Sequence, residues 1–386
     1  MKFAFISNYY THHQKPFCEA MYALTKGDFR FIATEDFSGE RKSLGWREEE
    51  GVSYVVQKNK AVESCAETVN NADAVILGSA PFSDVLGRLE KGGTVFKYSE
   101  RIFKGGYSYV KWLPRVLRYY RTYGRHKALY LLSAGAYAAG DFAIHGVFRN
   151  KSYKWGYFPE TRHYKPESLF GRKNTRRILW CGRLIGWKHP ELAINIAKRL
   201  ADDGEEFCMD IIGSGELEAE IAKRIAAEKL CDRVCLMGAM SSESVRDEME
   251  TAGIFIFTSD FNEGWGAVLN EAMNSGCAVV ASHAAGSVPY LISQGENGYI
   301  YENGNEDALY RRVKQLLNDE EKQRQLGEAA YKTIVELWNG ELAAKRLIHL
   351  TDEINKKGCF EPYKNGPCSR AETMTNGWYK EVSYDV

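Results

Sequence analysis

One stretch of the chain, residues 254–276, predicts a strand, a loop and a helix in immediate succession. The apolar run Ile254–Phe257 indicates a buried strand, and a loop rich in glycine follows it. A short helix is expected to begin near Ala267 and to end at Gly276, before a further apolar strand at Ala278–Ala281. This order puts backbone N–H groups and a helix N-terminus at the carboxyl end of a strand, where open α/β sheets bind anionic ligands.

Two carboxylates accompany this stretch, Glu263 in the loop and Glu271 on the helix. If they stood alone, a solvated loop acid and a surface helix acid would explain the pair.

The composition excludes several classes of protein. Among 386 residues, 51 Lys and Arg balance 51 Asp and Glu, so no overall field attracts nucleic acid. The nine cysteines form no C-x-x-C pair and no zinc pattern with histidine, which favours reduced thiols packed as small hydrophobic groups. The N-terminal apolar run is too short for a signal peptide, and no window is long enough for a spanning helix. We therefore expect a cytoplasmic protein, soluble or peripheral to the inner face of the plasma membrane.

Strand and helix patterns alternate along most of the chain, which predicts doubly wound parallel sheets. A segment with two prolines and many charges, 158–174, interrupts the alternation and suggests an interdomain linker. From Glu320 to Lys356 the pattern is almost wholly helical, and the last thirty or so residues show no clear period. We expect an N-terminal domain at 1–160, a linker at 161–175, a second domain at 176–335, and a C-terminal helix and tail at 336–386 that pack back on the first domain.

Further charged and glycine-rich motifs follow the predicted strands of the second domain. Arg183 and Lys188 stand in Gly-Arg-Leu-Ile-Gly-Trp-Lys after the first strand, where both can project into a cleft and neutralise a diphosphate. Gly213 and Gly215 follow the next strand, but a lone G-x-G can serve a tight turn alone. The sequence has no G-x-G-x-x-G fingerprint, no P-loop and no Asp-x-Asp pair for a metal-bound diphosphate.

Together these motifs resemble the nucleotide-sugar-binding half of the GT4-type retaining glycosyltransferases (glycosyl transferases group 1). The resemblance covers about 175–320 and depends on four motifs in order: Gly182-Arg183-Leu184 with Lys188, Ile212-Gly-Ser-Gly215, Glu263-Gly-Trp-Gly with Glu271, and Gly295-Glu-Asn-Gly298. It implies the GT-B fold, an α/β architecture of two Rossmann-like domains whose parallel sheets face each other across a cleft, with C-terminal helices.

The resemblance also implies roles for individual residues. Glu271 is expected to hold the ribose hydroxyls of the nucleotide, and Arg183 and Lys188 the diphosphate. Glu263 should meet the donor sugar. Backbone amides should assist at the sugar and at the helix start, and they come from Gly264, Trp265, Gly266, Ala267, Val268 and Leu269.

Two fixed cations and a helix dipole can stabilise a departing diphosphate without a metal, so neither a metal nor a cofactor is expected. Retention in this family is usually explained by attack from the face of the leaving group. On that account no glutamate acts as a nucleophile.

The first domain is expected to bind the acceptor, but its catalytic groups are less defined. Many relatives carry a histidine at the end of a mid-domain strand, where this chain has Ser99 and Glu100. Either these two residues take that place, or His12 or His13 from the first loop does. For each histidine, an ordinary polar loop residue is as good an interpretation as a catalytic residue.

Residues 101–127 hold many cations and no acid, interleaved with aromatic and aliphatic side chains. The cations are Arg101, Lys104, Lys111, Arg115, Arg118, Arg121, Arg125 and Lys127. Such a segment suits an anionic membrane surface or a polyprenyl-diphosphate-linked acceptor, and equally a solvated helix whose apolar side packs on the domain.

The sequence thus predicts a hexosyltransferase that moves a sugar from a nucleotide-diphosphate sugar to a saccharide or lipid-linked acceptor in polysaccharide assembly. The alternatives are a GT-B-fold epimerase and a catalytically silent GT-B subunit that binds sugars or a partner enzyme.

Overall fold

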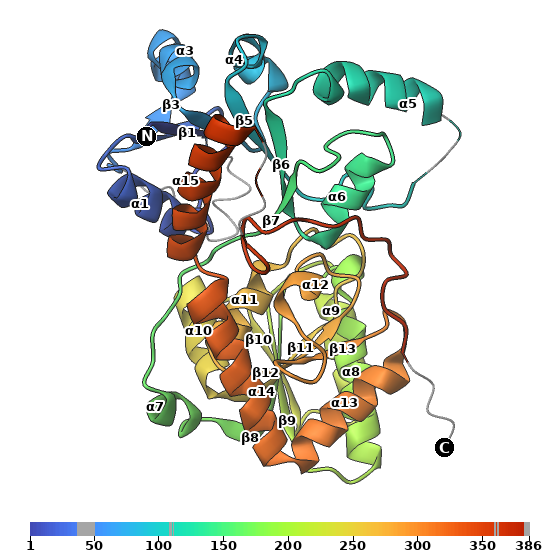
Figure 1. The fold of residues 1–386 in the computed structure, drawn as a ribbon. Coiled ribbons are helices and arrows are strands. Elements are labelled where there is room, and N and C mark those ends of the chain that lie inside the picture. Colours follow the sequence, from blue (N-terminus) through green and yellow to red (C-terminus); the bar gives the residue numbers. More distant parts are fainter. Residues whose placement is uncertain (37–50, 108–109, 111, 359, 361–362, 382–386) are drawn as a thin grey trace. The chain divides into compact units, whose positions relative to one another are not determined.

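The structure is a computed structural model that describes residues 1–36, 51–107, 110, 112–358, 360 and 363–381. Lys111 of the basic segment lies outside these residues. The chain forms two compact units (Figure 1). Unit 1 consists of Met1–Glu160 and Leu337–Thr375, and unit 2 consists of Thr161–Glu336 and Asn376–Val386.

Unit 1 contains a parallel sheet that, within the described residues, has seven strands in the order β3-β2-β1-β4-β5-β6-β7. The strands are β1 (Phe3–Ser7), β2 (Phe29–Ala33), β3 (Val55–Gln57), β4 (Ala74–Leu77), β5 (Thr94–Ser99), β6 (Leu129–Ala134) and β7 (Ser152–Trp155). Its helices are α1 (Lys15–Leu24), α3 (Val62–Asn71), α4 (Leu86–Glu90), α5 (Trp112–Tyr119), α6 (Ala136–Ala143) and α15 (Gly340–Lys357).

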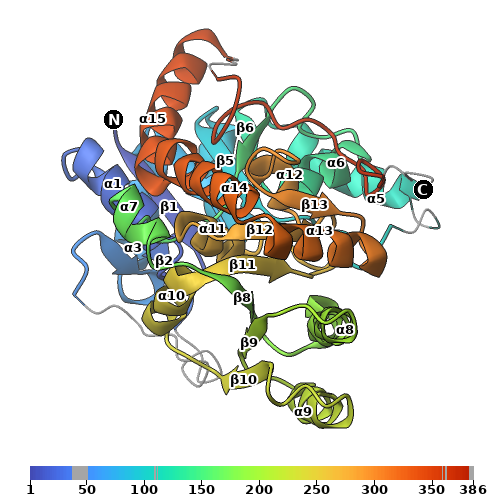
Figure 2. The same ribbon diagram turned by 90° about the horizontal axis from the view of Figure 1, so that it is seen from below.

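Both faces of this sheet are buried, which explains the nearly continuous apolar runs of its strands. One face carries Ala4, Ile6, Val75 and Leu77, which form a core with side chains of α3, α4 and α6. Helix α15 joins unit 1 although it comes from the C-terminal part of the chain, and it lies beside α1 in both views (Figures 1 and 2).

Unit 2 contains a second parallel sheet, with six strands among the described residues in the order β10-β9-β8-β11-β12-β13. The strands are β8 (Asn174–Cys181), β9 (Cys208–Ile212), β10 (Val234–Gly238), β11 (Ala252–Phe257), β12 (Ala278–Ser282) and β13 (Tyr299–Tyr301). The helices are α7 (Pro166–Phe170), α8 (Pro190–Asp202), α9 (Glu218–Ala227), α10 (Ser242–Thr251), α11 (Ala267–Asn274), α12 (Val288–Leu291), α13 (Glu306–Asn318) and α14 (Glu320–Lys332).

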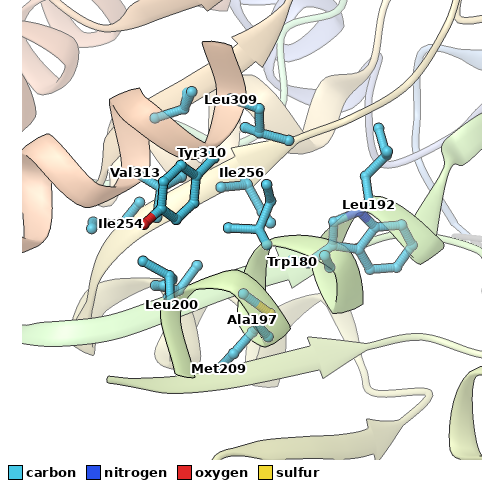
Figure 3. Close-up of a cluster of buried hydrophobic side chains, with 14 of the residues drawn as sticks. Trp180, Leu192, Ala197, Leu200, Met209, Ile254, Ile256, Leu309, Tyr310 and Val313 are labelled. Atoms are coloured by element: carbon cyan, nitrogen blue, oxygen red, sulfur yellow. The ribbon is translucent and has the colours of Figure 1, made fainter. Parts of the chain in front are cut away.

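The main core of unit 2 lies between its sheet and helices α8, α9 and α13. Trp180 of β8, Met209 of β9 and Ile254 of β11 meet Leu200 of α8 and Val313 of α13 (Figure 3). Period-2 spacing in the strands and period-3.6 spacing in the helices put these side chains on facing surfaces. The core fixes β8 and β11 side by side, and the loops that follow these strands carry the predicted site.

The C-terminal part is almost wholly helical from Glu320 to Lys357, as the sequence pattern predicts, and a buried segment follows it. Helix α14 ends at Lys332, a π-helical turn spans Thr333–Leu337, and Asn339 starts α15 by accepting a hydrogen bond from the Leu342 amide at 2.8 Å. In the segment after α15, Cys368 and Ser369 are buried and bond to Lys154 of β7 through their backbones. Backbone pairing leaves little trace in a sequence, because any residue type can make it.

Among the described residues, no helix combines the length and the apolar character that a membrane crossing requires.

Candidate functional site

The strand order of unit 2 reverses between β8 and β11, which creates a topological switch point. Strand β9, next in sequence after β8, lies on the other side of β8 from β11. The loop Gly182–Lys188 follows β8, and the loop Thr258–Gly266 follows β11. Ligands of doubly wound sheets bind in the crevice at such a point. The structure therefore brings together two motifs that are about 80 residues apart in the sequence.

The two loops are joined by an ion pair between Lys188 and Glu263. The Lys188 ammonium contacts Glu263 Oε2, and the side chains are only 13% and 10% exposed. Ser259 Oγ donates a second hydrogen bond to the same carboxylate oxygen at 3.0 Å. Pairing offsets the cost of burying the two charges. The sequence predicted separate contacts for these residues, with the diphosphate and with the sugar, and gave no sign that they contact each other.

A chain of buried hydrogen bonds positions Lys188. The Trp180 indole Nε1 donates to Thr258 Oγ1 at 2.8 Å, and that hydroxyl donates to the Lys188 carbonyl at 2.6 Å. The Asp260 amide also donates to the Trp187 carbonyl at 3.0 Å. Both loops are therefore fixed to each other by backbone as well as by charge.

Trp187 is a site residue that the sequence reasoning missed. Its ring centroid lies 4.7 Å from Lys188 Nζ and 5.6 Å from the guanidinium carbon of Arg183. The indole thus holds both cations that were predicted to bind the diphosphate. Arg183 is exposed. The available signal was the position of an aromatic residue between two cations in a strand-end loop.

His189 was missed as well. Its backbone has φ of 52°, which few residues other than glycine adopt. Its Nδ1 lies 2.7 Å from Glu191 Oε1 and its Nε2 lies 3.4 Å from Asp260 Oδ2. The hydrogen bond to Glu191 is the main cause that raises the pKa of His189. This histidine therefore connects the start of α8 to the loop that contains Glu263.

Gly213 and Gly215 pack against the backbone of the loop Gly182–Lys188, which is called the cation loop because it contains Arg183 and Lys188. A Cβ on Gly213 (φ +138°) would lie 1.8 Å from the Gly182 carbonyl oxygen, and one on Gly215 would lie 2.4 Å from the Leu184 carbonyl oxygen. The Leu184 amide donates to the Ser214 carbonyl at 2.9 Å. Close backbone packing thus explains both glycines in this structure.

Helix α11 begins at Ala267, and the residue before it, the N-cap Gly266, has a left-handed φ of 88°. The Trp265 side chain is fully buried and its Nε1 donates to Asn270 Oδ1 at 2.8 Å, so its ring belongs to the core. The Leu269 amide donates to the Gly266 carbonyl at 3.0 Å. The first amides of a helix have no partner within it, and among the described residues no backbone hydrogen bond is donated by the Ala267 or Val268 amide, so these two are candidate donors to an anion. Gly264 precedes them in the buried part of the loop.

Glu271 projects from α11 into a poorly solvated position. Burial raises the pKa of this carboxyl to about 7, although Arg246 and then Arg162 act in the opposite direction. Among the residues the structure describes, its carboxylate makes no hydrogen bond or ion pair. Burial, and next the charge of Glu271, raises the pKa of Cys181 to about 12, and Lys188 opposes this. Glu271 and Lys188 are therefore both close enough to Cys181 to act on its pKa.

Unit 1 has its own switch point, between β1 and β4, and a cavity of about 360 Å³ lies there. His13, Ser99 and Glu100 line it, as three of the four predicted acceptor-side residues. His12 does not line the cavity, but its ring centroid lies 3.9 Å from that of His13. Burial, and next the neighbouring His12, lowers the pKa of His13 to about 3, so this imidazole is neutral near pH 7.

Comparison with known proteins gives one family for the second unit. Residues 164–333 match the family model described as glycosyl transferases group 1. The poly(glycerol-phosphate) alpha-glucosyltransferase of Bacillus subtilis is 32% identical over 150 residues, which are 39% of this chain and 22% of that protein. The amylovoran biosynthesis glycosyltransferase AmsK of Erwinia amylovora is 30% identical over 183 residues, 46% of this chain and 45% of that one. The chain thus spans less than half the length of these curated relatives.

Solved structures resemble the whole chain. The crystal structure of TarM has a TM-score of 0.67 at 13% identity, and the match covers 91% of this chain and 99% of that one. Anabaena Alr3699/HepE in complex with UDP has a TM-score of 0.66 at 15% identity, covering 92% and 100%. At these identities the likeness shows the fold, and the predicted fold class is confirmed.

The first prediction concerns pH and stability. The raised pKa of Glu271 means that the unfolded chain loses this proton from about pH 4.5 and the folded chain only near pH 7. The free energy of unfolding should therefore fall as pH rises between these values. Glu271→Gln should remove this loss, so its advantage over the wild type should grow by about 2 kcal/mol from pH 5 to pH 8.

Urea denaturation at both pH values measures this difference. The exposed Glu220 on α9 offers a control, and Glu220→Gln should shift stability equally at both pH values. An equal shift for Glu271→Gln would contradict the raised pKa.

The second prediction concerns the glycine loop. Gly213→Ala should lower the free energy of unfolding by about 2 kcal/mol or more, because its methyl group collides with a backbone carbonyl. Gly186→Ala is the matched control in the cation loop itself, since a Cβ on Gly186 would meet nothing within 4 Å and its φ is not positive. Denaturation midpoints compare the two; equal midpoints would mean that the loops do not pack as described.

Proposed function

Since residues 164–333 belong to the glycosyl transferases group 1 family and the chain has the GT-B fold, we propose that the protein is a retaining glycosyltransferase. It moves a hexosyl group from a nucleoside-diphosphate sugar to a saccharide or lipid-linked acceptor in polysaccharide or glycan assembly. Unit 2 is the donor domain and unit 1 the acceptor domain. The observation that carries the proposal is the meeting of two cations, a helix start and a poorly solvated carboxyl at the switch point of unit 2.

Bond breaking at the donor leaves negative charge on the diphosphate. Arg183 and Lys188, held by one indole, and the first amides of α11 supply fixed positive groups for that charge. Preorganised charges of this kind stabilise a transition state without a reorganisation cost. No metal has to take part in this scheme.

The Lys188–Glu263 ion pair gives the two residues complementary tasks. Lys188 faces the diphosphate, and the carboxylate of Glu263, held by Ser259, accepts hydrogen bonds from the hydroxyls of the donor sugar. Because the two side chains contact each other, the group that binds the phosphate and the group that binds the sugar keep a fixed relative position. A carboxylate at this position also favours positive charge that develops on the sugar ring.

Glu271 receives the ribose hydroxyls of the nucleotide. Its carboxylate is short of hydrogen-bond donors within the described structure, and two adjacent hydroxyls supply them. Uridine nucleotides are the first donors to consider, because the Anabaena neighbours were solved with UDP and with UDP-glucose.

A donor screen tests this proposal. The full chain is incubated with common nucleotide sugars, and release of the nucleoside diphosphate is measured. Turnover with an acceptor and a product that keeps the donor's anomeric configuration distinguish a retaining transferase from a GT-B-fold epimerase, and binding without turnover identifies a silent subunit. Failure to bind any nucleoside diphosphate would overturn the donor-site assignment.

The third prediction concerns Arg183. Because its side chain is exposed, Arg183→Ala should fold normally but lower kcat about 100-fold through lost leaving-group stabilisation. Arg324→Ala is the control, since that side chain is 62% exposed on α14 and pairs only with Glu328 among described residues. Steady-state kinetics with the donor found in the screen provide the measurement. An unchanged kcat would assign leaving-group stabilisation to other residues.

The basic segment in unit 1 supports an acceptor at a membrane. Tyr119 and Tyr123 attach α5 and the following turn to the domain; Tyr119 stacks on His145 with ring centroids 4.2 Å apart. A second stripe, Leu113, Leu117 and Tyr120, is 50–60% exposed. The apolar side of the helix is therefore not wholly used by the domain.

Cations flank the exposed stripe. Arg118 and Arg121 are exposed beside it, and Arg115 is half-buried against Tyr107. An apolar stripe between arginines fits the boundary between anionic headgroups and acyl chains. We propose that unit 1 contacts an anionic membrane here and meets a polyprenyl-linked acceptor there.

The fourth prediction tests this contact. Replacing Arg115, Arg118 and Arg121 with Gln should weaken binding to vesicles that contain anionic lipid at least tenfold, at about 1 kcal/mol per charge. A charge-matched control replaces the exposed Lys345, Lys356 and Lys357 of α15. Vesicle co-sedimentation measures both variants, and equal binding would end the membrane proposal.

A further inference from the structure

The cavity in unit 1 is formed by the carboxyl ends of β1, β4 and β5. Its walls come from three loops: the one after β1, with Asn8, Thr11 and Gln14; Gly78 and Ser79 after β4; and the end of β5 with the turn that follows. Most of these groups are neutral and polar. They suit the hydroxyls of a saccharide.

One side chain in this cavity has no place in the functions described so far. Lys97 belongs to β5 and lines the cavity, and its Nζ donates to the Gly78 carbonyl at 2.8 Å. Gly78 itself packs closely on β1, since a Cβ there would lie 2.7 Å from Ser7 Oγ. An ammonium has three N–H groups, so one bond to a carbonyl leaves further donors for a ligand.

The other charges that line the cavity already have partners of opposite sign. Glu100 pairs with Lys104 at 2.7 Å and accepts the Tyr157 hydroxyl at 2.7 Å. Arg101 pairs with Asp141 at 3.5 Å. Within the described chain, Lys97 pairs with no carboxylate.

The pKa of Lys97 is consistent with the lack of a paired carboxylate. Burial alone lowers the pKa of its ammonium to about 8, and no neighbouring carboxylate acts against that shift. A poorly solvated cation without a counter-charge is costly, and a bound anion removes that cost.

We propose that Lys97 binds an anionic group, a phosphate or a carboxylate, on the acceptor substrate. The inference rests on the proposed transferase function, in which unit 1 binds the acceptor, and specifies the chemical class of that acceptor. Lys97 supplies the charge-assisted contact, and the neutral polar groups around it hold the adjoining sugar.

Protection from chemical modification tests the site directly in the full chain. Reductive methylation at pH 8 modifies unprotonated amines, and Lys97 should react measurably because its pKa is about 8. Peptide mass spectrometry follows it beside the exposed Lys91 as an internal reference. Glycerol 3-phosphate or glucuronate at millimolar concentration should slow labelling of Lys97 at least fivefold, whereas glycerol and glucose should not.

Each outcome has a meaning. Protection by the phosphate alone indicates a phosphate-bearing acceptor, protection by glucuronate alone indicates a uronate, and protection by both indicates a general anion site. Equal effects of charged and neutral probes would overturn the proposal. So would a Lys97 that does not react at all, because a cavity closed to a small reagent is closed to an acceptor.

Variants supply the functional test. Lys97→Met should raise KM for an anionic acceptor at least tenfold and leave both KM for the donor and the rate with a neutral acceptor unchanged. Lys97→Arg should restore part of the loss, and Lys91→Met is the control. If Lys97→Met raises KM for the anionic and the neutral acceptor equally, the lysine only supports the Gly78 backbone. If no nucleoside diphosphate binds, the transferase proposal fails, while the labelling result still decides whether this cavity binds anions.

Discussion

Two hydrogen bonds through one hydroxyl hold the candidate site of unit 2 together. Thr258 accepts from the Trp180 indole in the core and donates to the Lys188 carbonyl in the loop, so the packing of β8 and β11 is transmitted directly to the cation loop. A buried indole N–H without a partner costs free energy, which makes this arrangement strongly preferred over a detached loop. The backbone around Lys188 is thus already ordered, so the ion pair between Lys188 and Glu263 forms without further loss of backbone entropy.

Much of the architecture follows from the sequence because both sheets are buried on two faces. Apolar runs such as Ile254–Phe257, followed by glycines, predict the strands with small errors at their ends; β11 begins two residues earlier, at Ala252. The four motifs of unit 2 can be recognised in the sequence for a physical reason: close backbone approach requires glycine, and an anion site requires cations. Gly213 illustrates the limit, since its pattern indicates a turn but not the carbonyl that it faces.

The parts that the sequence left open depend on contacts between distant residues. Lys188 and Glu263 contact each other, yet no local pattern connects them. Lys97 lies in an ordinary strand, and only the charge balance of the surrounding cavity distinguishes it from a surface lysine. The faces of α5 were undecided because a helical period gives two stripes without saying which one meets the domain; the stacking of Tyr119 on His145 decides it.

The chain passes between the two units three times, after Glu160, Glu336 and Thr375. Unit 1 therefore receives α15 from beyond unit 2, and unit 2 receives Trp378, whose indole donates to the His283 carbonyl at 3.3 Å. A single recombination event near residue 160 would leave unit 2 whole but separate Met1–Glu160 from Leu337–Thr375, the segment that completes unit 1. An exchange of either whole unit with that of a related protein therefore requires all the junctions that bound the unit to be chosen together.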